Sequence, residues 1–277
     1  MQELIERFIG YLKMKNVSGE TVKLYLFYLK KLSEEIKSSE EITLGNLSKI
    51  TAKHEWNKPS VGIFLRIVSS FCGFLENENV IQRNPLRGFA TSKLETHKRY
   101  LILADKEIAK ITEVCDRLLP IKENIAIRLL CETGVRRSEL LNIQVKNIDL
   151  KNRAIYLEKT KGGIPRVVFF SKSTAEKISG YTTTLQGEYL LPKMASTLPF
   201  VIKKVISLAF PMDTEKAKEI TAHSFRHSFA TSWLQNNRHP VVLKKLMGWQ
   251  SLNMLNVYEH LQVGKLQQEY NIFLKKR

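Results

Sequence analysis

The sequence predicts a mainly α-helical protein with one small antiparallel β-sheet, in which an N-terminal helical bundle precedes a mixed α+β domain. Apolar residues recur every three or four positions through most of the chain, which is the period of an amphipathic helix. Only the stretch 145–170 alternates apolar and polar residues, as half-buried strands do. The length of 277 residues suits one or two domains.

The composition indicates an anionic partner. Lysine and arginine total 44 against 27 aspartate and glutamate residues, which gives a formal net charge of +17. Nucleic acid is the usual partner of such a chain, and a membrane surface is the alternative. No apolar run approaches the roughly 18 to 20 residues that span a bilayer, and Glu3 and Glu6 stand where a signal peptide would be basic. We therefore expect a cytoplasmic protein that does not bind membranes.

The cysteines predict no disulfide and no metal site. Cys72, Cys115 and Cys131 are far apart in the sequence and odd in number. This spacing is typical of reduced residues in a core, and it lacks the pairs that a zinc site needs.

Residues 1–88 predict a small helical bundle with basic outer faces. A breaker at Ser18-Gly19 and a start at Pro59-Ser60 separate three amphipathic stretches, and 44–50 predicts one more short helix. The apolar positions of the three stretches are Leu4, Ile5, Phe8, Ile9, Leu12, Val22, Tyr25, Leu26, Leu29, Leu32, Ile36, Val61, Phe64, Leu65, Val68, Phe71, Cys72 and Leu75. Lysine-rich helix faces are often only solvated, but the net charge of the chain favours contact with DNA phosphates, which position a protein without reading sequence.

A boundary follows the bundle. Asn84-Pro85 ends the bundle, and residues 87–99 are polar, basic and without period. We therefore predict a linker over 89–100 and a second domain over 101–277.

The second domain is expected to begin with helices around a turn that carries an arginine. Gly134 ends one predicted helix and Ser138 or a neighbour starts the next, so Arg136 projects from near a helix N-terminus. Backbone N–H groups at such a point favour an anion, so the arginine is either an ordinary surface residue of a turn or part of a phosphate cradle. Glu139 follows three residues later, where its carboxylate can hold the guanidinium in place.

Strand-like alternation then predicts a β-hairpin with a lysine at its tip. The apolar positions that we expect on the buried face are Ile148, Leu150, Ile155, Leu157, Val167 and Phe169. Turns at Lys151-Asn152 and Lys161-Gly162-Gly163 separate the strands, which places Lys159 and Lys161 at a hairpin tip. A lysine there is either an exposed turn residue or a proton donor that reaches a neighbouring cleft.

A later helix carries His223 and Arg226 three residues apart, on one side of its start. One alternative is that His223 is a capping or core histidine, and another is zinc binding by His223 and His227. The metalloprotease motif has a glutamate directly after its first histidine, where this chain has Ser224, and no third ligand is evident. We therefore expect no metal here.

These motifs, taken in order, resemble the tyrosine recombinase superfamily of phage integrases and Xer-type enzymes. That family has an arginine in a T-G-x-R-x-x-E-L turn, a hairpin lysine, an H-x-x-R helix, a G-H or G-W element and a tyrosine shortly afterwards. The matching residues are Thr133-Gly134-Val135-Arg136 with Glu139-Leu140, Lys161, His223 with Arg226, Gly248-Trp249, and Tyr258. Many Xer-like members have histidine in place of Trp249. Lys159 is the alternative hairpin lysine, although Lys161 fits the family's K-G-x-x-x-R register, which ends at Arg166.

The resemblance implies a site-specific recombinase that cuts and rejoins DNA through a 3′-phosphotyrosyl intermediate and a Holliday junction. Tyr258 would be the nucleophile. The other residues would move protons and stabilise charge at the phosphate: His223 as proton acceptor, Arg136 and Arg226 on the non-bridging oxygens, Lys161 as donor to the leaving 5′-oxygen, and Trp249 as an indole donor or packing residue. No metal, ATP or other cofactor is implied.

The resemblance also implies an architecture and an assembly. A core-binding (SAM-like) domain over 1–88 and a catalytic domain over 101–277 would form a C-shaped clamp around double-stranded DNA. Four copies would assemble on two synapsed recombination sites, with the C-terminal helix 265–277 docked on a neighbouring protomer. Integrase and chromosome-dimer resolvase are equally compatible roles. The alternatives are a DNA-binding regulator of the same fold without catalysis, and a relaxing enzyme like the type IB topoisomerases.

Overall fold

The computed structural model describes residues 1–88, 101–158, 165–236 and 238–251. The chain divides into two compact units, Met1–Lys98 and Arg99–Arg277. The division falls inside 89–100, the stretch predicted as a linker, and that stretch lies outside the described residues. Most described residues are helical, and the strands form one small antiparallel sheet, so the predicted fold class is confirmed.

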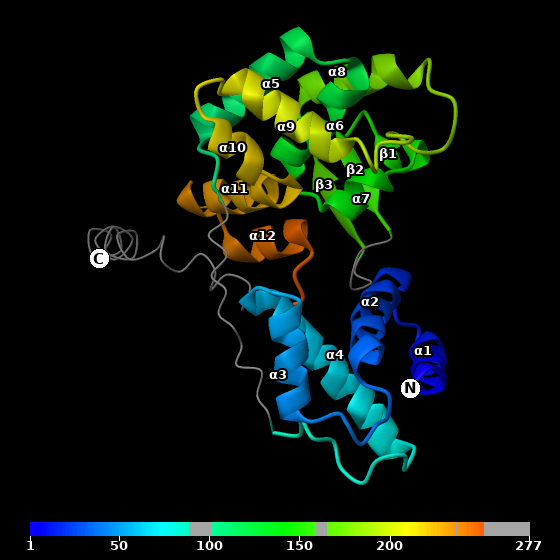
Figure 1. The fold of residues 1–277 in the computed structure, drawn as a ribbon. Helices are drawn as coiled ribbons and strands as arrows, with labels where there is room; N and C mark the ends of the chain where they lie inside the picture. The colour runs from blue at the N-terminus through cyan, green and yellow to red at the C-terminus, as the bar shows by residue number, and fades with distance from the viewer. Residues whose placement is uncertain (89–100, 159–164, 237, 252–277) are drawn as a thin grey trace, which may run out of the picture. The chain divides into compact units, whose positions relative to one another are not determined.

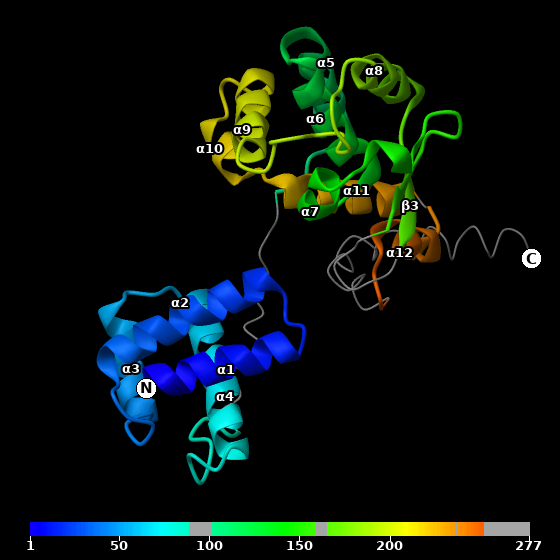
Figure 2. The same cartoon turned by 90° about the vertical axis from the view of Figure 1, so that its right-hand side faces the viewer.

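The first unit is a bundle of α1 (Gln2–Met14), α2 (Gly19–Glu35), α3 (Leu44–Lys53) and α4 (Lys58–Asn77). Side-chain caps start three of these helices, because Ser18, Thr43 and Asn57 each accept a hydrogen bond from a backbone N–H in the first turn. In Figure 2, α1, α2 and α4 lie side by side, and these three helices contact one another. Their facing apolar positions form a continuous core around Phe8 and Phe71, which are fully buried.

Helix α4 is long and apolar enough to span a membrane, whereas we expected no apolar stretch of that length. Among the described helices it is the one that is long and apolar enough, with 20 residues and a mean hydropathy of 1.3 in its best window. Phe64, Val68, Phe71 and Leu75 on α4 are fully buried inside the first unit. The helix is therefore apolar because it forms the centre of a protein core.

The second unit is built around α6 (Ile121–Thr133), which is buried along almost its whole length. Helices α5 (Asp105–Leu118), α8 (Lys172–Thr182), α9 (Leu198–Ala209) and α11 (Ala222–Gln235) pack against it (Figure 1). The remaining helical elements are α7 (Arg137–Leu141), the 3-10 turn η1 (Val145–Asn147), α10 (Thr214–Glu219) and α12 (Pro240–Met247). α12 lies against both α11 and β3, and it brings the last described residues next to the sheet.

The sheet has the strand order β1-β2-β3, with β1 (Ile148–Asp149), β2 (Ala154–Leu157) and β3 (Arg166–Phe169) all antiparallel. Ile155 and Leu157 on β2 face the core as predicted. On β3 the prediction was wrong by one residue: Val168 is buried, whereas Phe169 is 56% exposed. The other buried position of β3 is Arg166. Because a charged residue takes a core position, the apolar alternation that the sequence shows is shifted to the wrong face.

Candidate active site

The turn between α6 and α7 places Arg136 at the start of a helix. Gly134 caps α6 in the left-handed conformation, with φ of 60°. A Cβ atom at this glycine would lie 2.8 Å from the ring of Phe229 and 3.0 Å from the sulfur of Met247, so α11 and α12 approach this turn closely. Two residues later Arg136 is the N-cap residue of α7, and its backbone N–H donates to the Glu139 carboxylate at 2.7 Å.

Glu139 is the buried centre of an ion-pair cluster. Its side chain is 1% exposed and accepts hydrogen bonds from the guanidinium of Arg136 at 2.8 Å and from that of Arg166 at 2.7 Å to each oxygen. Burial acts to raise the pKa of Glu139, but the hydrogen bonds from Arg166 and from Arg136 outweigh it and lower that pKa to about 2. Glu139 is therefore an anion at neutral pH, held between two cations.

The C-terminal end of α12 brings the arginines together. The last carbonyls of a helix have no partner within the helix and carry partial negative charge, so they attract cations. Three consecutive carbonyls here accept from three arginines: Leu246 from Arg166 Nε at 2.7 Å, Met247 from Arg226 Nη2, and Gly248 from Arg136 Nη2 at 3.4 Å. Arg166 comes from β3, Arg226 from α11 and Arg136 from the α6–α7 turn. All three donate to carbonyls at the C-terminal end of α12.

Helix α11 carries the predicted His223 and Arg226 on its first turns. Arg226 is buried, and it also donates to the Gly134 carbonyl, so it connects the α6–α7 turn with α12. His223 is exposed one turn earlier. On the following turn burial lowers the pKa of His227 to about 4, aided by the nearby His223 and Arg226, so its imidazole is neutral at neutral pH. Among the described residues, no three His, Cys, Asp or Glu side chains form a group that could hold a metal ion.

Trp249 follows α12, directly after Gly248. It is 6% exposed and packs with Leu243 and Met247 of α12 and with residues of α11. Gly248 before it adopts φ of 60°, and a Cβ atom there would lie 3.0 Å from the Arg166 side chain. A pocket opens between β3 and α12 beside this glycine, with Arg166, Lys244, Lys245 and Trp249 among its lining residues.

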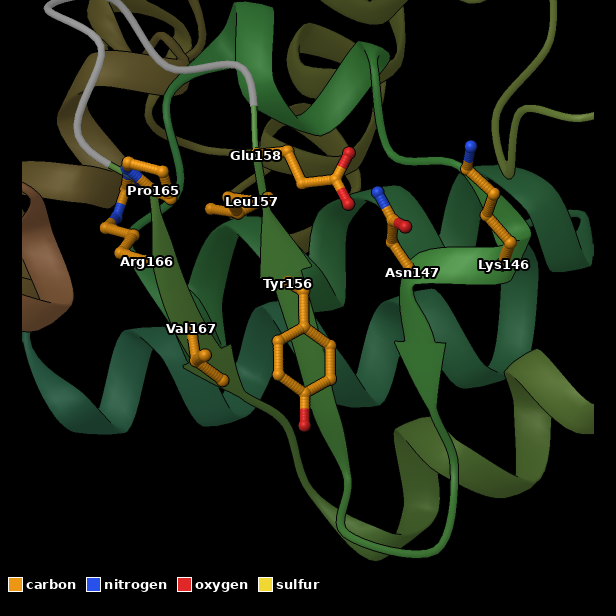
Figure 3. A pocket seen from close by; sticks show the side chains of 8 residues that line it. All are labelled: Lys146, Asn147, Tyr156, Leu157, Glu158, Pro165, Arg166 and Val167. Carbon is orange, nitrogen blue, oxygen red and sulfur yellow. The ribbon is translucent and has the colours of Figure 1, made fainter.

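The hairpin lysine and the tyrosine lie outside the described residues. Lys159 and Lys161 fall in 159–164, and Tyr258 falls in 252–277. Figure 3 shows Glu158 and Pro165, the last described residues on either side of the hairpin tip. It also shows Tyr156 and Val167, a cross-strand pair on the exposed face of the sheet, in a pocket that Arg166 helps to line. Among the predicted site residues that the structure describes, Arg136, Glu139, Arg226 and Trp249 lie together at the end of α12.

Arg166 is the part of this cluster that the sequence motifs did not single out. In the sequence, Arg166 is only the last residue of the K-G-x-x-x-R pattern, which favours Lys161 over Lys159 as the hairpin lysine. An arginine at the start of a short strand is expected to face solvent. β-strand periodicity alone does not indicate that it forms a buried ion pair.

Comparison with known proteins places the chain. The model of the phage integrase family matches residues 102–265, more than half of the sequence. The chain belongs to the phage integrase family. The integrase match spans every residue predicted for the site, from Arg136 to Tyr258, and the predicted resemblance to tyrosine recombinases is confirmed.

Relatives of this integrase match along nearly its whole length. It is 27% identical to the tyrosine recombinase XerA of Saccharolobus solfataricus, over 97% of this chain and 91% of the relative. It is 25% identical to XerA of Pyrococcus horikoshii, over 96% and 92%. Among solved structures, the XerH site-specific recombinase bound to a palindromic difH substrate aligns with a TM-score of 0.74, 18% identity and coverage of 97% and 84%. A lambda integrase dimer bound to a COC′ core site aligns with a TM-score of 0.70, 17% identity and coverage of 92% and 96%. These structures share the fold of the chain.

Proposed function

We propose that this integrase is a site-specific DNA recombinase whose nucleophile is Tyr258. The tyrosine attacks the scissile phosphorus, forms a 3′-phosphotyrosyl bond and releases a 5′-hydroxyl. The covalent bond conserves the energy of the broken phosphodiester, so that a 5′-hydroxyl from a second duplex can reverse the step and give a Holliday junction. The reaction therefore needs neither ATP nor another energy source.

The observation that carries this proposal is the convergence of Arg136, Arg226 and Trp249 on one end of α12. The two arginines are 90 positions apart in the sequence, yet both donate to carbonyls of α12, directly ahead of the segment that contains Tyr258. Fixed cations at the end of α12, which precedes Tyr258 in the sequence, fit the charge that develops on a phosphate during attack. Arginine suits this task because its planar guanidinium can donate to two phosphate oxygens at once.

Each remaining residue has a role in proton transfer or packing. A phenol has a pKa near 10, so Tyr258 needs a proton acceptor at neutral pH, and the exposed imidazole of His223 is the candidate on the first turn of α11. Lys161 is assigned as the donor to the 5′-oxygen, with Lys159 as its alternative. Trp249 packs the wall of the site and offers its indole N–H as a donor.

The partner is double-stranded DNA that carries recombination sites, and the working assembly is a homotetramer on two synapsed sites. The net charge of +17 supports a polyanionic partner. The segment 265–277 has apolar residues at roughly helical spacing ahead of three basic residues, which suits a helix that docks on a neighbouring protomer. With DNA as its partner, the enzyme is assigned to the cytoplasm of a prokaryotic or virus-infected cell.

A nicked suicide substrate tests the chemistry. Its short 5′-hydroxyl fragment diffuses away after cleavage, so the covalent complex accumulates and is seen as a shifted band on a denaturing gel. We expect wild-type protein to form the complex, Tyr258→Phe to form none, and the control Tyr189→Phe, which removes an exposed hydroxyl elsewhere, to match wild type.

Three other outcomes would change the assignment. DNA binding without any covalent complex would indicate a regulator. Relaxation of supercoiled DNA without recombinant products would indicate a topoisomerase-like enzyme. A covalent complex that persists in Tyr258→Phe would show that another residue is the nucleophile.

A further inference from the structure

Arg166 is buried in the cluster, and all three of its guanidinium nitrogens donate hydrogen bonds there. Its side chain is 4% exposed. Both terminal nitrogens donate to Glu139, one to each carboxylate oxygen at 2.7 Å, and Nε donates to the Leu246 carbonyl at 2.7 Å. A two-pronged bond between a guanidinium and a carboxylate is the strongest form of such a pair. Glu139 therefore makes its main ion pair with Arg166, and the Arg136 guanidinium adds one further hydrogen bond to the carboxylate.

The guanidinium of Arg136 makes fewer hydrogen bonds with Glu139 than that of Arg166 does. Arg136 reaches the Glu139 carboxylate through one guanidinium nitrogen at 2.8 Å, and its side chain remains 20% exposed. Without Arg166, both oxygens of a buried carboxylate would be open to Arg136, which could then form the two-pronged bond itself. Arg136 would be drawn inward, and its charge would be cancelled.

The charges of the cluster lead to the same conclusion. The three arginines and Glu139 leave two positive charges, which match the phosphate and the negative charge that builds up on it during attack. Removal of the Arg166 charge alone leaves one. Because the cluster is largely buried, water screens this difference weakly and each charge has a large effect.

We propose that Arg166 is a positioning residue that neutralises Glu139, and so keeps the charge and the reach of Arg136 available for the scissile phosphate. This inference rests on the proposed function, since it concerns the phosphate that Tyr258 attacks. Arg166 also begins β3, two residues after the segment 159–164, and donates to the Leu246 carbonyl of α12. The same side chain therefore fixes the base of the hairpin to the carbonyls that hold the other arginines.

A double-mutant cycle that neutralises the two charges separates this role from a purely structural one. The variants are Arg166→Met, Glu139→Gln and the double variant Glu139→Gln/Arg166→Met. The measurement is the single-turnover rate of covalent complex formation on a saturating nicked substrate. Arg166→Met leaves the Glu139 charge to Arg136 alone, and we expect a loss of about 100-fold, the size seen when one charge-stabilising donor is removed. The double variant restores two positive charges, and we expect it to react about tenfold faster than Arg166→Met.

The matched control is an exposed arginine–glutamate pair on α5. Arg117 lies 3.6 Å from Glu113, and both side chains are largely exposed. We expect Arg117→Met and Glu113→Gln/Arg117→Met to react at the wild-type rate. Arg166→Lys keeps the charge without the fork and should react faster than Arg166→Met. Circular dichroism and thermal unfolding are recorded for each variant, and Arg166→Gln replaces Arg166→Met if the latter does not fold.

The outcomes are distinct. A double variant that is as slow as Arg166→Met, or slower, overturns the inference, because a structural role or a direct DNA contact predicts no recovery. An Arg166→Met enzyme with the wild-type rate overturns it as well. If wild-type protein forms no covalent complex, the proposed function fails and the cycle is not reached.

Discussion

At the scale of single residues, two glycines allow the arginines to reach their places. Gly134 and Gly248 both end helices with φ of 60°, and the carbonyl of each accepts a hydrogen bond from a site arginine. Left-handed backbone is strained for residues with a Cβ atom, so glycine is the favoured residue at such helix ends. The first glycine belongs to the T-G-x-R motif, so the left-handed helix end explains why that motif contains a glycine.

Gly134→Ala tests this reason. The new Cβ would meet the Phe229 ring at 2.8 Å in a backbone conformation that alanine rarely adopts. We expect the free energy of unfolding to fall by about 1–3 kcal/mol and covalent complex formation to slow, as measured by urea denaturation and by the nicked substrate. Gly180→Ala on α8 is the control, because its Cβ meets nothing within 4 Å, and it should be neutral or stabilising. Equal effects of the two substitutions would contradict the account.

At the scale of elements, apolar periodicity predicted the bundle helices and the strands, and failed in the register of one strand. The position of the α6–α7 turn follows from its breakers, whereas α8, α10 and α12 were not predicted. The register of β3 does not follow from periodicity, because its buried positions are Arg166 and Val168. A buried charge depends on a partner far along the chain, here Glu139, and a local pattern contains no sign of that partner. The convergence of three arginines on α12 was hidden for the same reason.

The register of β3 can be measured directly. We expect Val168→Ala to lower the free energy of unfolding by about 1–3 kcal/mol, because Val168 is 1% exposed and pairs with the buried Ile155. Phe169→Ala removes a larger side chain that is mostly exposed, and we expect a change within about 1 kcal/mol. Urea denaturation of both variants gives the comparison. The reverse order would restore the alternation that the sequence shows and would contradict the observed register.

At the scale of the whole molecule, the three site arginines lie in the described residues, and the proposed nucleophile Tyr258 and the C-terminal segment lie outside them. The family match extends to residue 265, so it includes Tyr258 and ends where the proposed docking helix begins. Catalysis and assembly are therefore assigned to adjacent parts of the chain, and each can be removed separately.

Deletion of residues 265–277 tests the assembly. We expect binding to a single site to persist, while synapsis of two sites and recombination are lost, as followed by gel shift and by product formation. The variant Lys275→Gln/Lys276→Gln/Arg277→Gln removes the terminal charge and keeps Leu266, Tyr270, Phe273 and Leu274, so it should retain synapsis if apolar docking is what matters. Unchanged synapsis and recombination after the deletion would rule out the docking role.

If Tyr258 is the nucleophile, it becomes bonded to the 3′-phosphate of cleaved DNA, and peptide mapping of the covalent complex identifies the bonded residue. Trypsin cuts after Lys245 and Lys265, so the tryptic peptide 246–265 has Tyr258 as its one tyrosine. After nuclease treatment, mass spectrometry should find the nucleotide adduct on this peptide at Tyr258, with a free 5′-hydroxyl on the other DNA end. An adduct on any other residue, or a 5′-linked nucleotide, would contradict the account.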